Sequence, residues 1–147
     1  HPQKINLSEN CFLNILYPFS QDDIENNDLN NTSIVSNLKW KDVSILFTGD
    51  IGTRVEKKII KKYDDLEVDV LKVAHHGSDT SSNLDFLRKI KAKYSIISSG
   101  VDNYFSHPSS QVLGNLEIVK SEVFRTDTDG RITLTSNEMK FDISREK

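Results

Sequence analysis

The sequence predicts an α/β fold in which a mixed β-sheet is flanked by helices. Short apolar runs typical of buried strands recur along the chain, and segments with helical apolar spacing separate those in its middle. Further strand-like runs lie on both sides of that middle part. The 147 residues fit one domain or part of one, with no internal repeat and no clear boundary.

Each element is predicted from its own signal. Apolar runs bounded by turn residues predict strands, and these span residues 11–18, 33–40, 43–48, 68–74, 94–99, 122–126, 131–135 and 139–143. Amphipathic spacing predicts helices, and these span residues 54–63, 83–90 and 109–117. Residues 21–31 are rich in Asp and Asn, so we expect a long loop there.

Turn and cap residues predict the connections. Residues 41–42 join two predicted strands as a hairpin, although this Lys-Asp pair lacks the usual glycine. Residues 127–130 are expected to form the turn of a second hairpin. Ser81 or Ser82 is a natural N-cap for the second predicted helix, and Pro108 can open or precede the third.

Composition restricts the function classes. The net charge of −3 does not attract nucleic acid in bulk, so any such contact needs a local basic patch. The single cysteine, Cys11, excludes a disulfide framework and a Cys-based zinc site. No apolar run approaches the ~18 residues of a membrane span, and we expect no membrane contact from the chain itself.

The first predicted helix is strongly basic. A solvated face is the common explanation for such a run of charge, and the alternative is a groove that follows a phosphate backbone. The residues concerned are Arg54, Lys57, Lys58, Lys61 and Lys62.

Candidate functional residues follow three predicted strands. Asp50 closes the third strand in Thr-Gly-Asp, His75 and His76 follow the fourth, and His107 lies in the loop after the fifth. Ligand-binding groups gather at the carboxyl ends of strands in open α/β sheets, and His and Asp are common ligands of zinc and manganese. We therefore expect Asp50, His75 or His76, and His107 to converge on one pocket.

These candidates also have structural alternatives. Asp50 is alternatively the start of a turn or a helix cap. The His pair is alternatively one core and one surface histidine, which is the ordinary outcome on a strand because adjacent residues face opposite sides. His107 taken alone is an ordinary surface histidine.

Two further features are open between two interpretations. Lys72 is a charge inside an apolar strand, and it either faces solvent or partners a carboxylate near the site. Ser78 and the hydroxyl residues 80–82 either bind an anion at a helix start or simply cap the helix. A serine nucleophile is disfavoured because no Gly-x-Ser-x-Gly segment occurs.

With these segments in order, the chain resembles the metallo-β-lactamase superfamily, and within it the hydrolase domain at the C-terminal end of ComEC competence proteins. The most specific block runs from Asp69 to Ser78 and contains Leu-Lys and His-His-Gly-Ser. The matching blocks cover residues 30–35, 46–50, 69–78, 80–82, 96–100, 103–108 and 125–130.

The resemblance implies roles for the candidate residues. Asp50 would bridge two divalent ions, zinc or manganese, and His107 would be the last ligand. His75 and His76 would serve catalysis, phosphate binding or metal ligation, with Lys72 among the catalytic groups. Three residues of the matching blocks are expected to bind substrate: Asn31, Ser78 and Asn103.

The departure from the superfamily is its His-x-His-x-Asp-His signature, which is absent here. We therefore expect residues 1–147 to be the C-terminal part of such a domain, half of an αββα sandwich. The other half was removed, lies on another chain, or was lost. Such a half should bind metal weakly or not at all. Its open sheet face should be covered by the missing half or by a second copy.

The expected function is metal-dependent hydrolysis of phosphodiesters, with DNA in competence-type uptake as the first substrate, and it is incomplete in this chain. Two ions in the complete domain would activate water and clamp the phosphoryl oxygens. The alternatives are hydrolysis of a phosphocholine, a lactone or a thioester, and a non-catalytic binding module. The setting is open between the outer side of a bacterial membrane protein and a secreted protein.

Overall fold

A mixed sheet forms the centre of the computed structural model, which describes residues 3–24, 28–136 and 141–146. Within these residues the sheet has seven strands in chain order, antiparallel from β1 to β4 and parallel from β4 to β7. The strands are β1 (Gln3–Ser8), β2 (Cys11–Tyr17), β3 (Val35–Trp40), β4 (Val43–Phe47), β5 (Val70–Lys72), β6 (Tyr94–Ile97) and β7 (Glu122–Arg125).

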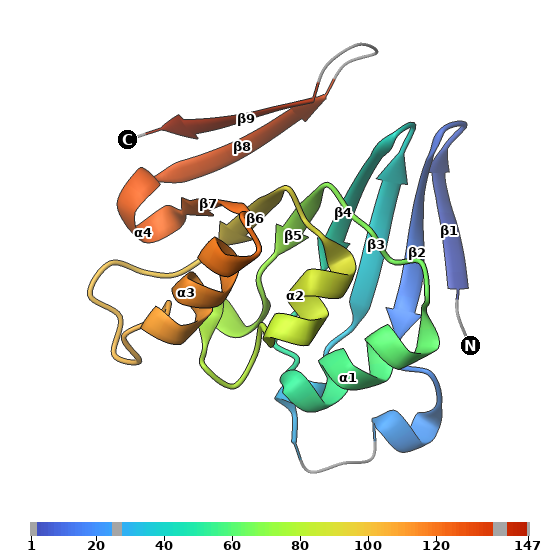
Figure 1. Cartoon of the computed structure of the whole chain (residues 1–147). Coiled ribbons are helices and arrows are strands. Elements are labelled where there is room, and N and C mark those ends of the chain that lie inside the picture. The colour runs from blue at the N-terminus through green and yellow to red at the C-terminus, as the bar shows by residue number, and fades with distance from the viewer. Residues whose placement is uncertain (1–2, 25–27, 137–140, 147) are drawn as a thin grey trace.

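The helices lie along one face of this sheet (Figure 1). The helical segments are η1 (Gln21–Asp23), η2 (Asn30–Thr32), α1 (Thr53–Lys62), η3 (Ala74–Gly77), α2 (Leu84–Ile90), α3 (Ser110–Ile118) and α4 (Thr126–Asp129). Leu46, Leu71 and Ile97 point from the strands into a core that α1, α2 and α3 close with buried apolar residues such as Ile59 and Phe86. Burial of these side chains is the main force that holds the helices on the sheet.

A separate hairpin covers part of the opposite face. It consists of β8 (Arg131–Ser136) and β9 (Phe141–Glu146), and its side chains pack against Val70, Ile96 and Phe124. This second core lies over β5, β6 and β7.

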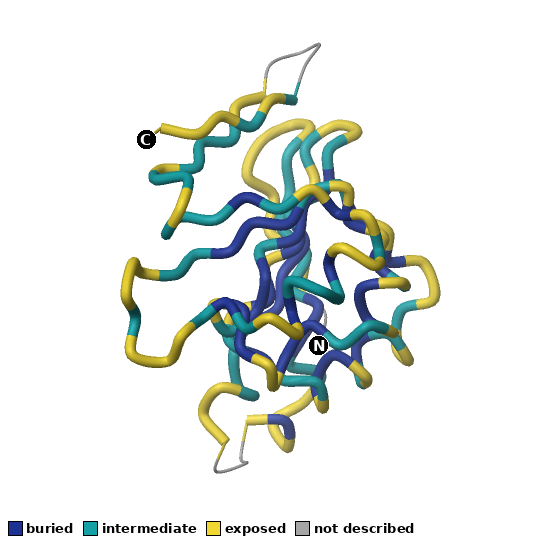
Figure 2. Tube along the Cα trace, turned by 60° about the vertical axis from the view of Figure 1, so that its left-hand side comes forward, coloured by how far each residue is buried: buried dark blue, intermediate teal, exposed yellow. Residues whose placement is uncertain are grey.

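Beyond the hairpin, the opposite face carries apolar side chains that are only partly covered. Ile5 and Phe47 are 45% and 40% exposed. A groove of about 180 Å³ lies between the sheet and the hairpin, lined mainly by Cys11, Leu38, Trp40, Val43, Ile45, Leu134 and Phe141. Figure 2 shows this contrast, with the middle of the sheet buried and the hairpin and outer strands partly or fully exposed.

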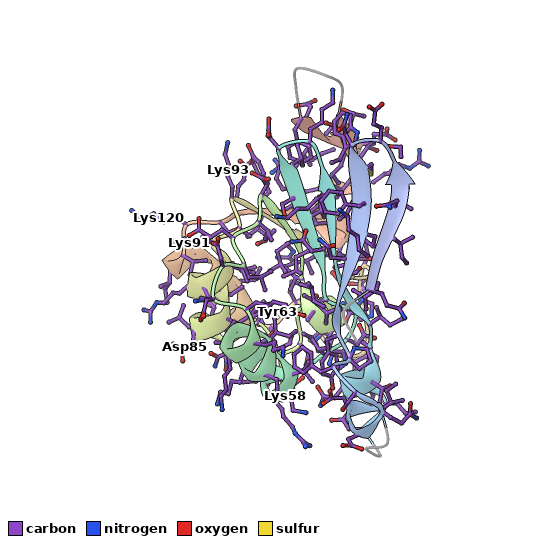
Figure 3. All side chains as sticks on the ribbon, turned by 90° about the vertical axis from the view of Figure 1, so that its right-hand side faces the viewer. Lys58, Tyr63, Asp85, Lys91, Lys93 and Lys120 are labelled. Atoms are coloured by element: carbon purple, nitrogen blue, oxygen red, sulfur yellow. The ribbon has the colours of Figure 1, made fainter. Side chains whose placement is uncertain are left out.

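The predicted α/β class with a mixed sheet and flanking helices is confirmed, as are most elements, while the half-sandwich of the αββα type stays a prediction. The sheet is mixed and flanked by helices, and the hairpin at residues 41–42 forms because Lys41 adopts a left-handed backbone with φ +51° in place of glycine. Tyr63, at the end of the basic helix, points toward the strands (Figure 3), where its hydroxyl donates to Leu16 O at 2.9 Å. The strand β1 was not predicted.

Two predicted connections are wrong. Residues 127–130 do not join a hairpin, because Thr126–Asp129 forms the short helix α4 and β8 pairs with β9 rather than β7. The backbone N–H of Arg125 donates to the Asp129 carboxylate, which closes this turn. The cap of α2 is Asn83, whose side chain accepts from Asp85 N, and not Ser81 or Ser82.

The predicted loop at 21–31 is also more ordered than expected. It contains η1 and η2, while residues 25–27 lie outside the described part. Asp23 is buried, accepts the backbone N–H groups of Phe19 and Ser20, and pairs with Lys58. The last predicted strand begins later, at Phe141, and residues 139–140 lie outside the description. In the described residues no helix is long and apolar enough to cross a bilayer.

Candidate functional site

The carboxyl ends of β4, β5 and β6 lie side by side because these three strands are parallel neighbours. Asp50 follows β4, His75 and His76 follow β5, and His107 lies in the loop after β6. The Asp50 carboxylate lies 3.8 Å from His76 Nε2, and the His75 and His107 rings are 5.9 Å apart between centroids. The structure therefore brings the four side chains to one edge of the sheet, as expected from their positions.

The two histidines reach the same edge through an unusual backbone turn. His75, His76 and Gly77 have φ values of +48°, +56° and +85°, all in the left-handed region. The backbone N–H of His75 donates to Gly49 O at 3.1 Å, which joins the ends of β5 and β4. Left-handed non-glycine residues are costly and gather at functional sites. His75 and His76 therefore lie outside strand β5, and the alternation of side chains between the two faces of the sheet does not apply to them.

Close approach explains the glycine in each of the two turns. A Cβ on Gly77 would lie 2.6 Å from Pro108 Cβ, so only glycine allows the His107 loop to pack on the histidine turn. A Cβ on Gly49 would lie 2.6 Å from Ser33 Cβ. The Ser33 hydroxyl accepts the backbone N–H of Asp50 at 3.1 Å, which holds the backbone that carries the carboxylate.

His76 is oriented by a backbone carbonyl. Its Nδ1 lies 2.7 Å from Ser98 O, and because a carbonyl only accepts, Nδ1 carries the proton. In the neutral ring the lone pair is then on Nε2, the nitrogen that lies 3.8 Å from the Asp50 carboxylate. Metal-binding histidines in proteins commonly donate their second N–H to a carbonyl in this way. Both side chains are accessible, with 52% of His76 and 43% of Asp50 exposed.

The spacing of this pair fits a shared divalent ion. A separation of 3.8 Å is too long for a direct hydrogen bond. Bonds of about 2.0–2.2 Å from zinc to nitrogen and oxygen place two ligands of one ion roughly 3–4 Å apart. The described residues contain no cluster of three His, Cys, Asp or Glu side chains able to hold an ion. Asp50 and His76 are therefore closely enough spaced to serve as two ligands of one divalent ion. Water or another segment would fill its remaining coordination positions.

The surroundings of His107 favour its neutral form. Burial lowers the pKa of its imidazole, His75 and His76 lower it further, and Asp79 acts weakly in the opposite sense. Its Nδ1 is buried, and it has no hydrogen-bond partner among the described residues. A neutral imidazole keeps a lone pair for a cation.

Lys72 lies on the hairpin side of β5 and is half-buried. Its Nζ donates to Val73 O at 3.2 Å. Burial lowers the pKa of its ammonium, and the negative charge of Asp50 opposes that shift. The carboxylate that acts on the pKa of Lys72 is therefore Asp50 of the candidate site. A catalytic role for Lys72 stays a prediction.

The three predicted substrate-binding residues all brace site loops. Asn31 Oδ1 accepts the N–H of Gly52 at 2.8 Å, just after Asp50. Asn103 accepts the N–H of His107 at 2.8 Å and donates to its carbonyl at 2.7 Å. The Ser78 hydroxyl is buried and lies 3.0 Å from Thr80 Oγ1. Their direct contact with a substrate stays a prediction.

Sequence patterns did not indicate that four other residues, Ser98, Thr80, Asn30 and Phe105, contact the candidate histidines. The Ser98 carbonyl has no signal, because any residue carries one. Thr80 Oγ1 and Asn30 Nδ2 each lie 3.4 Å from a ring nitrogen of His75 and set its orientation. Phe105 stacks on His107 with centroids 5.7 Å apart, and two consecutive aromatics beside a candidate histidine were a usable signal.

A hollow of about 360 Å³ adjoins the site. It runs from His75 to the start of α1, and both Asp50 and Arg54 line it. The remaining lining residues are Asp28, Asn30, Asn31, Gly52, Thr53 and Thr80.

Comparison with known proteins gives relatives for most of the chain. It is 36% identical over 103 residues to ComE operon protein 3 of Bacillus subtilis, which covers 70% of the chain and 13% of that protein. It is 34% identical over 109 residues to Competence protein ComA of Neisseria gonorrhoeae, covering 74% and 16%. It is 35% identical over 89 residues to Recombination protein 2 of Haemophilus influenzae, covering 60% and 11%.

The chain is similar to one segment of competence-related proteins. It spans only 11–16% of the length of these three relatives. No protein-family model matches it. The resemblance to competence proteins is confirmed at this level.

Proposed function

We propose that the chain is the C-terminal part of a metal-dependent phosphodiester hydrolase of the metallo-β-lactamase type, acting on DNA in competence. One observation carries the proposal. His76 lies between the Ser98 carbonyl, 2.7 Å from its Nδ1, and the Asp50 carboxylate, 3.8 Å from its Nε2. That arrangement is the usual one for a metal-binding histidine and its carboxylate neighbour.

The chain's own residues would act as follows. Asp50 and His76 would hold a zinc or manganese ion, and His107 would offer a further nitrogen. A bound ion lowers the pKa of a water ligand and offsets phosphoryl charge. His75 lines the hollow, where Asn30 and Thr80 contact its two ring nitrogens, and a phosphate oxygen that took the place of either contact would receive its N–H.

The fold supports the superfamily part of the proposal. Helices cover one face of the sheet, and the other face carries an apolar surface over β1–β4 that the hairpin leaves partly open. A second sheet on that face would complete an αββα sandwich, and it would also supply the missing ligands. The names of the relatives support competence as the setting, and DNA as the substrate is our proposal from that setting.

The test is hydrolysis by a chain that carries a His-x-His-x-Asp-His segment upstream of residue 1. With manganese or zinc we expect cleavage of both bis(4-nitrophenyl) phosphate and DNA. Asp50→Ala should abolish both activities, because no other described residue can take its place beside His76. His76→Ala should reduce both strongly. Lys62→Ala should mainly weaken DNA binding in a salt-sensitive way.

The matched control is Asp42→Ala, because Asp42 is an exposed carboxylate just before β4 and Asp50 follows the other end of the same strand. This variant should keep full activity. Metal-independent cleavage, or full activity in Asp50→Ala, would remove the proposal. If the protein cleaves bis(4-nitrophenyl) phosphate but not DNA, its natural substrate is another ester.

A further inference from the structure

The loop between β6 and α3 exposes a cluster of apolar side chains next to the site. Tyr104 is 94% exposed, Phe105 73% and Val101 71%. Single exposed apolar residues are common, but a group on one short loop indicates a binding surface.

Polar contacts, rather than burial of the aromatic rings, hold this loop in place. Asn103 binds both the N–H and the carbonyl of His107 and also donates to Gly100 O at 2.9 Å. The N–H of Ser106 donates to Asn103 O at 3.0 Å. The hydrogen bonds of Asn103 therefore fix the loop backbone, and the two aromatic rings remain exposed on it.

The aromatic rings form a continuous series that ends in the site. Tyr104 meets Phe105 edge-on at 5.4 Å, and Phe105 stacks on His107 at 5.7 Å with an interplanar angle of 19°. His107 then meets His75 at 5.9 Å. A flat ring placed on Phe105 would thus be separated from the candidate ligand His107 by one ring, and a ring placed against Tyr104 by two.

Positive charge lies on the other side of the same site. Arg54 lines the hollow together with His75 and Asp50. Lys57 and Lys61 are exposed and follow Arg54 at helical spacing along α1, while Lys58 is tied to Asp23. A row of cations about 10 Å long, at 1.5 Å per residue, suits a phosphate backbone.

We propose that Tyr104 and Phe105 form a stacking site for unpaired bases of a nucleic-acid strand whose phosphates pass the hollow toward Arg54, Lys57 and Lys61. Proteins that bind single strands combine aromatic platforms with a basic groove in this way. Bases in a duplex already stack on each other, so the exposed rings select an unpaired strand or end. This inference rests on the proposed function, whose substrate it specifies.

The carboxylates near the site oppose the phosphates. Asp28 and Asp50 line the hollow, and Asp79 and Asp102 are exposed nearby. A phosphate inside the hollow therefore needs a cation between it and Asp50, whereas stacking on Tyr104 does not. The base-dependent part of binding is expected to persist without metal.

The test measures fluorescence anisotropy of a labelled single strand of about 12 nucleotides, at low salt with a chelator. Tyr104→Ala should weaken binding of the normal strand by about 5- to 150-fold, the range for loss of one stacked base. Binding of an abasic strand of equal length should not change. Tyr104→Phe should restore binding, because it keeps the ring.

Two comparisons separate stacking from charge. Ile118→Ala removes another exposed apolar side chain, 59% exposed at the far end of α3, and should leave binding unchanged. Lys57→Ala should weaken the binding of normal and abasic strands alike. It should also reduce the slope of log K against log salt concentration by about one. A duplex of the same length should not respond to Tyr104→Ala.

Unchanged strand binding in Tyr104→Ala overturns the inference, as does an equal loss for normal and abasic strands. A loss confined to lipid vesicles or to a protein partner overturns it too. The same measurements distinguish a failure of this inference from a failure of the proposed hydrolase function. If the metal-loaded, upstream-extended chain cleaves bis(4-nitrophenyl) phosphate while Tyr104→Ala binds normally, only the inference fails. If the strand is bound base-dependently but no diester is cleaved, only the hydrolase proposal fails.

Discussion

The two faces of the central sheet are built differently. On the helix face, Leu46, Leu71 and Ile97 are fully buried beneath α1, α2 and α3. On the opposite face, the β8–β9 hairpin covers β5–β7, while Leu38 and Trp40 are only half-buried. The difference indicates that the helix face supplies most of the stability of this chain and holds the strand ends that carry the site. The opposite face keeps apolar surface that is only partly covered.

The largest expected effect tests this contrast directly. Leu71→Ala should lower the free energy of unfolding by about 2–5 kcal/mol, because it leaves a cavity in a closed core. Leu38→Ala, the same change on the half-buried face, should cost clearly less, since neighbouring side chains and water can fill the space. Urea denaturation measures both. Equal losses would show that the two faces contribute alike.

The buried carboxylate of Glu56 gives the helix face a pH dependence. It accepts the backbone N–H groups of Ser82 and Asn83, which ties α1 to the start of α2. Burial raises its pKa from 4.5 to about 7, with these two hydrogen bonds acting against the shift. Because the folded pKa lies above the unfolded one, the folded protein binds this proton more tightly. The resulting stability is complete below pH 4.5 and is lost as pH rises through about 7.

This loss can reach about 3 kcal/mol. Glu56→Gln should remove that part of the pH dependence, measured by urea denaturation at pH 4.5 and pH 7.5. The comparison variant is Glu67→Gln, since the Glu67 side chain is 58% exposed. It should leave the profile unchanged. A Glu56→Gln profile that matches the parent would contradict the buried, protonated state.

Two glycines test how the site edge is held. Gly77→Ala should cost about 1–3 kcal/mol, because φ is +85° and the new Cβ would meet Pro108. It should also shift the amide resonances of the His107 loop. Gly114→Ala, within α3 and with nothing within 4 Å of the new Cβ, should instead stabilise by up to about 1 kcal/mol. If both changes stabilise, Pro108 does not pack on the histidine turn.

Sequence patterns predicted the sheet edge well, because apolar runs fix where strands end and parallel neighbours end together. They placed Asp50, His75, His76 and His107 near one another for that reason. They did not predict the left-handed backbone of His75 and His76, since non-glycine residues rarely adopt it. That conformation, and not a strand with opposite-facing side chains, is what brings both imidazoles to the edge.

The errors have local physical causes. Ser81, Ser82 and Asn83 are all good cap residues, and only the packing of Glu56 against the backbone of residues 82 and 83 selects Asn83. The Asp-Gly signal at residues 129–130 suggested a hairpin, but Asp129 bonds back to Arg125 and turns the chain into the second sheet. Both outcomes depend on contacts between elements, which local patterns do not contain.

Imidazole nitrogen NMR of His76, with and without zinc, tests the account most directly. Only four histidines occur in the chain, so the signals are few. We predict a proton on Nδ1, an unprotonated Nε2, and a zinc-dependent shift of the Nε2 signal that disappears in Asp50→Asn but persists in Asp42→Asn. A proton on Nε2, or an identical zinc response in Asp50→Asn, would contradict the assignment of Asp50 and His76 as the metal-binding pair.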